Sequence, residues 1–460
     1  MLAASVPRLA ANAVLLTGFA ALAWWHLGLF PAGMHEDDAF FYLQIARNLV
    51  ETGRVSFDGL NATNGVHPLW TAVLAAGTAA FSTLGLPMEV SLIAAAALPL
   101  LGFAAFCPAP VFAALLIACY LMGFGMEGVL GALLFVALAG TADRGWRVAL
   151  AMVALLLVLC RIDFALVLAL IGAWFAATRP RLLMPLLVGS VLGIFANLGA
   201  NWLMAGEVLS VSATHKAGAA FAQAGWDLVR FNYASPGNLV RLLLYLGALA
   251  TLVLSERSRG HALTAPWLHL SLAAFLAFHS TVSVLRDWYF AAPALTALAA
   301  CAYAGPPTRS ARRLALPCLL LPLLAIGWQM IRHAEDAAQY HAFLASIPRE
   351  GPPLFAYDGS GHIAFQLHPR PVINGDGLVN TPEFARRSDD AEWLEDWLTR
   401  HEVVGFFTNR GLPQCLTPRL CCPAGSVVPS HQWETGHPLL ADRLWMFPGR
   451  TICPLRPVVE

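Results

Sequence analysis

Long apolar runs fill the first 331 residues, and they constrain the fold of this chain more than any other feature. A helix needs about 20 mostly apolar residues to cross the roughly 30 Å hydrocarbon core of a bilayer. Only 12% of the 460 residues are Asp, Glu, Lys or Arg, against about 25% in soluble proteins, and residues 1–331 hold 30 of these 56 charges. So few charges cannot form a water-facing surface, and the chain is too apolar for intrinsic disorder. The sequence predicts an α-helical polytopic membrane protein.

Apolar runs and arginine placement together predict eleven crossings. The runs lie at residues 9–30, 68–84, 89–106, 126–141, 147–161, 163–178, 182–204, 237–255, 264–284, 287–304 and 312–331. With the N-terminus inside, this topology places ten arginines and three acids in the cytoplasmic loops, as the positive-inside rule requires. Residues 107–125 are therefore interpreted as a re-entrant or interfacial segment on the outer face, because a further crossing would invert everything after it.

This topology predicts that the long first loop (31–67), the 205–236 loop and the tail all face outward, away from the cytoplasm. The tail, 332–460, holds the other 26 charges and is expected to be a small soluble α/β domain beside the membrane domain, 1–331. Pro353–Tyr357 and Val403–Thr408 are typical of strands, and Ala391–Leu398 of an amphipathic helix. The apolar face of that helix consists of Trp393, Leu394, Trp397 and Leu398.

Four cysteines lie in a polar, proline-rich part of the tail: Cys415, Cys421, Cys422 and Cys453. Outside the cytoplasm, disulfides are expected among them, and the sequence does not choose between the three possible pairings. A zinc site is the alternative, but the paired Cys-x-x-Cys spacing typical of such sites is missing.

The first outer loop contains the most informative polar residues. Asp37 and Asp38 follow Glu36 and precede apolar positions at helical spacing, which predicts an amphipathic helix lying along the membrane surface. The acids stand at its N-terminus, where the helix dipole stabilises negative charge. They either cap this helix or act in catalysis, and composition alone gives the two roles equal weight.

Further ionisable residues lie at the predicted outer ends of the crossings, where charge near the hydrocarbon is costly and marks functional sites. They are His67, Glu127, Arg161 with Asp163, and Arg286 with Asp287 before Tyr289; Lys216, the only lysine, lies in the 205–236 loop. Internal ion pairs explain Glu127 and Arg161 equally well, and a structural role explains His67. Basic groups at this level suit the phosphate of a lipid.

These motifs, taken in order, resemble the GT-C superfamily of multi-pass glycosyltransferases. The motifs are Asp37-Asp38-Ala39-Phe40-Phe41-Tyr42, Thr63-Asn64-Gly65-Val66-His67-Pro68-Leu69-Trp70, Gly125-Met126-Glu127, Arg161-x-Asp163, Arg286-x-Trp288-Tyr289-Phe290 and Asn374-Gly375-Asp376-Gly377 in the tail. The resemblance covers residues 9–410 and is to a bacterial and archaeal branch of the superfamily. It implies a protein of the bacterial inner membrane that transfers a sugar from a polyprenyl-phosphate donor on the outer, periplasmic face. Protein O-mannosyltransferases and the aminoarabinose transferases of lipid A are more distant relatives, with Asp-Glu in place of Asp37-Asp38.

Sugar transfer needs a carboxylate that takes the proton of the acceptor hydroxyl, and cations that balance the charge of the leaving phosphate. We expect Asp37 to be the base and Asp38 to contact the acceptor or a divalent metal, whose involvement the sequence leaves open. Lys216 and Arg286 are expected to bind the phosphate. Arg161, Glu127, His67 and Tyr289 are expected to line the same substrate site, and Asp376 is either a turn residue or part of a cover over it.

The implied partners are the lipid-linked donor, a lipid, glycan or protein acceptor, and membrane lipids. A net charge of zero gives no reason to expect nucleic acid. The competing hypothesis is a transporter or binding protein for lipid-linked glycans. A transporter is expected to show internal repeats and polar groups at the midplane, whereas this sequence has no visible repeat and its charges gather at one face.

Overall fold

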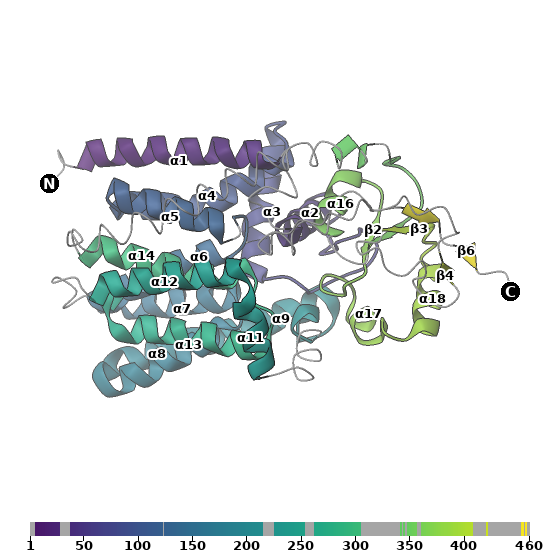
Figure 1. The fold of residues 1–460 in the computed structure, drawn as a ribbon. Helices are drawn as coiled ribbons and strands as arrows, with labels where there is room; N and C mark the ends of the chain where they lie inside the picture. Colours follow the sequence, from purple (N-terminus) through teal and green to yellow (C-terminus); the bar gives the residue numbers. More distant parts are fainter. Residues whose placement is uncertain are drawn as a thin grey trace.

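The computed structural model describes residues 5–27, 37–122, 124–214, 225–253, 262–304, 341–342, 344–345, 347–356, 360–407, 420–421, 452–454 and 456–457. In this part of the chain, helices lie side by side in a bundle, and an α/β unit sits at the end of the bundle away from the N-terminus (Figure 1). We refer to that end as the outer end. The predicted boundary between membrane domain and tail, at residue 331, lies outside the described residues.

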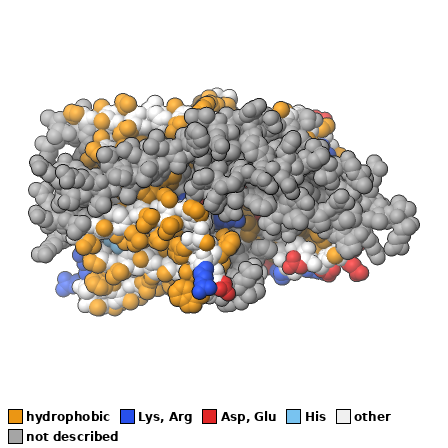
Figure 2. Space-filling view, in the orientation of Figure 1, with side chains coloured by type: hydrophobic (Ala, Val, Ile, Leu, Met, Phe, Trp, Pro, Cys, Tyr) orange, Lys and Arg blue, Asp and Glu red, His pale blue; other side chains and the backbone are white. Residues whose placement is uncertain are grey.

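The bundle helices are predominantly apolar. They are α1 Ser5–Leu27, α4 Met88–Phe106, α5 Ala109–Leu121, α6 Gly128–Arg144, α7 Arg147–Cys160, α8 Phe164–Thr178, α9 Pro180–Ala205, α12 Pro236–Val253, α13 Pro266–Val282 and α14 Ala291–Ala304. Among the described helices, α4 and α9 are long and apolar enough to cross a membrane, and several others are apolar but shorter. Figure 2 shows apolar side chains over the described part of the bundle, and Val148, Leu203 and Phe195 are 80%, 79% and 68% exposed. Such an apolar surface suits contact with lipid.

Residues 107–125 do not form the re-entrant or interfacial segment that the sequence analysis predicted. They supply α5, which runs lengthwise beside α1. The Asn12 amide near the start of α1 donates to the carbonyls of Ala104 and Cys107, both at 2.9 Å. At the other end of the same pair, the Phe19 and Phe124 rings meet edge to face at 5.1 Å. The segment thus supplies a 13-residue helix that packs inside the bundle.

The crossing predicted at residues 68–84 is also wrong. Helix α3 (Pro68–Thr83) lies across the outer end of the bundle, beside α2 (Asp37–Thr52) (Figure 1). It begins beside Glu127 at the start of α6, and Thr78 bonds Ser91 in the first turn of α4 at 3.0 Å. Its apolar residues are buried between α2 and bundle helices rather than in lipid, as the full burial of Trp70 and Leu74 shows.

Contacts at the inner end of the bundle show which helix ends lie together. At the inner end of the bundle, the Asp143 carboxylate accepts the Ala262 backbone N–H at 2.8 and 2.9 Å and lies 3.5 Å from the Arg179 guanidinium. The loops after α6 and α8 and the segment before α13 therefore meet at one end. Glu127 and Arg161 stand at the opposite ends of α6 and α7.

The amphipathic helix predicted after the acidic pair is present as α2, but it does not lie on an open surface. Ala39, Phe40, Leu43, Ile45 and Ala46 are at most 1% exposed. Helix α2 packs against α3 on one side and α16 of the tail on the other. Its apolar face is therefore a protein interface.

The tail contains a four-stranded sheet in the order β2-β1-β3-β5. Its elements are β1 Leu354–Ala356, α16 Ser360–Leu367, β2 Val372–Asn374, α17 Pro382–Arg387, α18 Ala391–Arg400, β3 Gly405–Phe407 and β5 Ile452–Pro454; β4 Leu420–Cys421 pairs separately with β6 Arg456–Pro457. The pairs β1–β2 and β1–β3 are parallel, and β3–β5 is antiparallel. The two predicted strands and the predicted helix are present, whereas α16, β2 and α17 were not predicted.

A small aromatic core supports this sheet. Trp393, Leu394, Trp397 and Leu398 of α18 are buried as predicted, and the Trp397 ring meets Phe384 edge to face at 4.8 Å. Two of the four tail cysteines, Cys415 and Cys422, lie outside the described residues. Cys421 and Cys453 lie in β4 and β5, and the proposed disulfides remain a prediction.

The tail docks on the first outer loop at close range. The Asp37 carboxylate accepts the backbone N–H groups of Gly361 and His362 at 3.0 and 2.9 Å, so it caps α16. The backbone of Leu378 presses against Gly65 so closely that a Cβ there would collide with its carbonyl. Further contacts at this junction are Arg386–Glu207 at 2.7 Å, His368–Glu51 at 3.1 Å and His401–Asn61 at 3.2 Å.

Gly65→Ala should weaken this docking, because the added methyl group meets backbone atoms of residue 378 that cannot move aside alone. Overpacking of this kind costs about 1–3 kcal/mol. Hydrogen exchange of the α16 amides is expected to accelerate in the variant. The matched control is Gly199→Ala, whose new Cβ has no atom within 4 Å. Equal exchange in the two variants would contradict the docked arrangement.

Candidate active site

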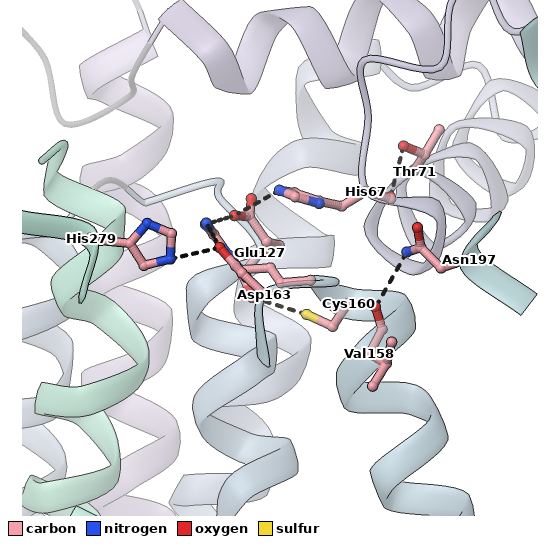
Figure 3. Close-up of polar contacts among 9 residues, drawn as sticks. His67, Thr71, Glu127, Val158, Cys160, Asp163, Asn197 and His279 are labelled. Atoms are coloured by element: carbon pink, nitrogen blue, oxygen red, sulfur yellow. Dashed lines mark hydrogen bonds and ion pairs between the residues drawn. The ribbon is translucent and has the colours of Figure 1, made fainter. Parts of the chain in front are cut away.

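A buried network of charged side chains lies at the outer end of the bundle (Figure 3). Its centre is Arg161, between α7 and α8, which makes a 2.6 Å ion pair with Oε1 of Glu127. The same guanidinium forms two bonds to Asp163, Nε to Oδ1 at 2.9 Å and Nη2 to Oδ2 at 2.7 Å. His67 and His279 extend the network at either side: their Nε2 atoms lie 3.5 Å from Glu127 and 3.1 Å from Asp163.

Local backbone geometry explains how these residues meet. Gly125 adopts φ +98, which a residue with a side chain rarely adopts, and turns the chain from α5 into α6 just before Glu127. Gly128 allows a close approach, since a Cβ there would lie 3.0 Å from the Trp288 carbonyl and 2.7 Å from the Ala291 Cβ. The short helix η2 (Asp287–Phe290) therefore packs on the start of α6, and the Tyr289 ring lies 4.7 Å from the Arg161 guanidinium carbon.

The network holds one guanidinium between two carboxylates. Burial alone would raise the pKa of Asp163, but the Arg161 charge and the hydrogen bonds from His279 and Arg161 outweigh it and hold the pKa well below its usual value. Asp163 is thus ionised. Two carboxylates therefore flank a single guanidinium, and the His67 and His279 rings are the next ionisable neighbours.

Glu127 is the most deeply buried member. Its side chain is 0% exposed, and its Oε2 atom has no hydrogen-bond partner among the described residues. A buried carboxylate oxygen without a partner is unfavourable. Burial, followed by the charge of Glu127, also raises the pKa of the nearby Tyr42 phenol well above its usual value, so this hydroxyl stays protonated. The most buried part of the network thus contains a carboxylate oxygen without a partner among the described residues, beside a protonated phenol.

The less buried members of the network form its partly exposed side, which we call the mouth. The side chains of His67 and Asp163 are 24% and 23% exposed, whereas that of Arg161 is 5% exposed.

Asn64 joins the first loop to the chain after α9: its amide donates to the carbonyls of Glu207 and Leu209 at 2.9 and 3.0 Å, and its oxygen accepts the Val211 N–H at 2.9 Å.

The structure brings together four of the residues predicted for the substrate site, His67, Glu127, Arg161 and Tyr289. Asp37 and Asp38 occupy the start of α2, as predicted, and Asp37 in addition caps α16 of the tail. Arg286 is exposed and precedes η2, outside the buried network. Lys216 lies outside the described residues.

Sequence reasoning missed two residues of this region. His279 follows Phe275 in an apolar helix and resembles an ordinary core histidine; the only available signal was an ionisable group inside an apolar run. Arg241 pairs with Asp287 at 2.5 Å and donates to the Leu121 carbonyl at 2.8 Å. Among the described residues, no cluster of three His, Cys, Asp or Glu side chains is arranged to hold a metal ion.

Solved structures provide the comparison that decides the fold. Crystallised ArnT from Cupriavidus metallidurans bound to undecaprenyl phosphate superimposes with a TM-score of 0.51 at 15% identity, covering 84% of this chain and 90% of that one. This chain has a GT-C fold. The apo state of the same ArnT gives a TM-score of 0.45 at 16% identity, over 79% and 85% of the two chains. No protein-family model matches the sequence, and no curated protein has a matching sequence.

The GT-C resemblance that the sequence predicted is therefore confirmed at the level of the fold. At 15% identity, the likeness to ArnT is one of architecture.

Removing the central cation should destabilise the bundle. Arg161→Met leaves Glu127 and Asp163 buried without their partner, which typically costs about 3–5 kcal/mol. Adding Glu127→Gln removes one of the uncompensated charges, so the double variant should recover part of the loss. Thermal unfolding in detergent, followed by tryptophan fluorescence, measures the order of Tm values. The exposed Arg54→Met is the control, and a double variant no more stable than Arg161→Met would contradict the network.

Proposed function

We propose that this protein transfers a sugar from a polyprenyl-phosphate-linked donor to an acceptor hydroxyl on the outer face of the bacterial inner membrane. The observation that carries the proposal is an acidic pair beside a buried ionic network, both at one end of an apolar bundle with a GT-C fold. A lipid-linked donor would reach that end from the bilayer. The ArnT structure with undecaprenyl phosphate supports the choice of lipid.

In the proposed reaction, the acceptor oxygen bonds to C1 of the sugar as the C1–O bond to the phosphate breaks. The lipid phosphate leaves with the bonding electrons, and the acceptor proton passes to a carboxylate. Because the leaving group is a phosphate, no strong general acid is needed. The protein must supply a positioned base and an electrostatic environment that stabilises the negative charge on the phosphate.

The two acids divide this work. Each oxygen of Asp37 accepts one backbone N–H from α16, so both oxygens are already engaged in holding the tail. This contact supports a revision of the role expected from the sequence: Asp37 orients the acceptor, and the half-buried Asp38 takes the proton. Both remain catalytic residues in the proposal.

Arg161 is neutralised by two carboxylates and buried, so the proposal gives it no direct contact with the phosphate. It holds Glu127 and Asp163 in place, with Tyr289 packed on its guanidinium. His67, at the mouth, and the exposed Arg286 are the described groups proposed to approach the phosphate, together with Lys216.

Asp38→Asn should lower turnover by about 10²–10⁴-fold, the usual loss on removing a general base. Donor binding should be nearly unchanged, because the amide keeps its shape and the phosphate contacts remain. The assay is transfer from a purified polyprenyl-phosphate sugar to a crude acceptor extract, with donor binding measured alongside. Asp37→Asn should also lower turnover, and in addition accelerate hydrogen exchange of α16, since an amide nitrogen cannot accept the second backbone N–H.

The control is Asp389→Asn, an exposed acid of the tail. Normal turnover in both Asp37→Asn and Asp38→Asn would contradict the catalytic proposal and indicate that the pair has a structural role. Donor binding without any transfer by the unmodified protein would favour a lipid-linked glycan transporter or binding protein.

A further inference from the structure

The tail sheet turns its carboxyl edge toward the acidic pair. Strands β1, β2 and β3 are parallel, with α16 connecting β1 to β2, and α17 and α18 connecting β2 to β3 on the other side of β1. In open parallel sheets of this kind, ligands bind outside the carboxyl ends of the strands, where the strand order reverses. Here α16 begins at that edge, and its first N–H groups hold Asp37.

Polar side chains lie along this edge, and one of their atoms makes no hydrogen bond within the described fold. Asn374, the last residue of β2, is 1% exposed, and its amide nitrogen donates to the Ser360 hydroxyl at the start of α16 at 2.7 Å. The oxygen of the same planar amide has no hydrogen-bond partner within the described part of the chain. Asn380 fixes the backbone here by donating to the Asn374 carbonyl at 2.8 Å. Through Ser360, which precedes Gly361, this amide lies next to the Asp37 junction, and its oxygen is a buried acceptor without a donor among the described residues.

The loop that follows β2 brings this edge to the mouth of the ionic network. Asp376 is half-buried and accepts the Leu378 N–H at 2.9 Å, so it shapes the turn at Gly377, whose φ is +79. This turn presses Leu378 against Gly65, two residues before His67. The loop 375–379 therefore forms a wall beside the mouth, which supports the cover that the sequence analysis considered for Asp376.

The hydrogen-bonding groups along this wall indicate which kind of ligand it can bind. The described segments that meet here, 37–38, 63–67, 360–362 and 374–380, contain carboxylates, amides, two hydroxyls and two imidazoles but no Lys or Arg. On the tail side, at 374–380, the polar side chains are one carboxylate and two amides, whose oxygens accept hydrogen bonds from hydroxyl groups. We propose that the carboxyl edge of the tail sheet is a binding subsite for a sugar, whose hydroxyls donate to Asp376 and to the Asn374 oxygen.

The placement of this subsite in a transfer reaction rests on the function proposed above, but sugar binding can be measured without it. The sugar is either the donor's own or part of a glycan acceptor. Two arms distinguish these sources, both with the full-length protein in lipid nanodiscs. One arm measures binding of methyl glycosides of common envelope sugars by saturation-transfer NMR. The other compares the affinity for a polyprenyl-phosphate sugar with that for polyprenyl phosphate alone.

Asp376→Asn is the informative variant, because the amide oxygen can still accept the Leu378 N–H and keep the turn while the charge is lost. A hydrogen bond to a charged group is worth enough that sugar affinity should fall about 10- to 100-fold in one of the two arms. Binding of polyprenyl phosphate alone should not change. Asp396→Asn, an exposed acid on α18, is the matched control and should bind like the unmodified protein.

Unchanged sugar affinity in Asp376→Asn, or no sugar binding by the unmodified protein in either arm, would overturn the subsite. Transfer activity that persists with a normal acceptor KM and donor KM in Asp376→Asn would also overturn it, while leaving the proposed function intact. Sugar binding that is lost in Asp376→Asn, in a protein that transfers no sugar, would support the subsite and contradict the proposed function.

Discussion

The ion pairs of Arg161 with Glu127 and Asp163 are the interaction on which the outer end of this molecule depends. They connect the start of α6 to the junction of α7 and α8, and through His67 and His279 they reach α3 and α13. Breaking such a buried pair on one side leaves an uncompensated charge, which is far more costly than never having formed the pair. The position of α3 across the bundle, and with it the mouth of the site, therefore depends on this network.

The second constraint is the contact between Asp37 and the first amides of α16. It gives one acid of the pair a fixed position and makes the tail part of the same site, rather than an appended domain. The apolar face of α2 is covered on both sides as a result, by α3 and by α16, and Phe40 contacts both His362 and Phe365 of the tail. The acids, the ionic network and the carboxyl edge of the tail sheet thus meet around one mouth.

The sequence predicted the class of fold, the helix after the acidic pair, and the meeting of His67, Glu127 and Arg161, because charge in an apolar chain is confined to a few positions. The sequence-based assignment of crossings failed where an apolar helix is buried by other parts of the protein, because its hydropathy is the same as that of a helix buried in lipid. Helix α3 is apolar because other helices cover it, yet it contains Thr71 and Thr78, whereas α5 contains no Ser or Thr and is preceded by Pro108. Hydropathy cannot separate the two cases for runs of 13 to 17 residues. Contacts between segments far apart in the sequence, such as Asp37 with Gly361, could not be predicted because they produce no local sequence pattern.

A structure of the protein with polyprenyl phosphate bound tests the central claim most directly, because the phosphate marks the reacting end of the donor. The account predicts a phosphate at the outer end of the bundle, at the mouth between His67 and the start of α2, with the polyprenyl chain along the apolar surface of the helices. A phosphate bound at the inner end, near Asp143 and Arg179, would contradict it.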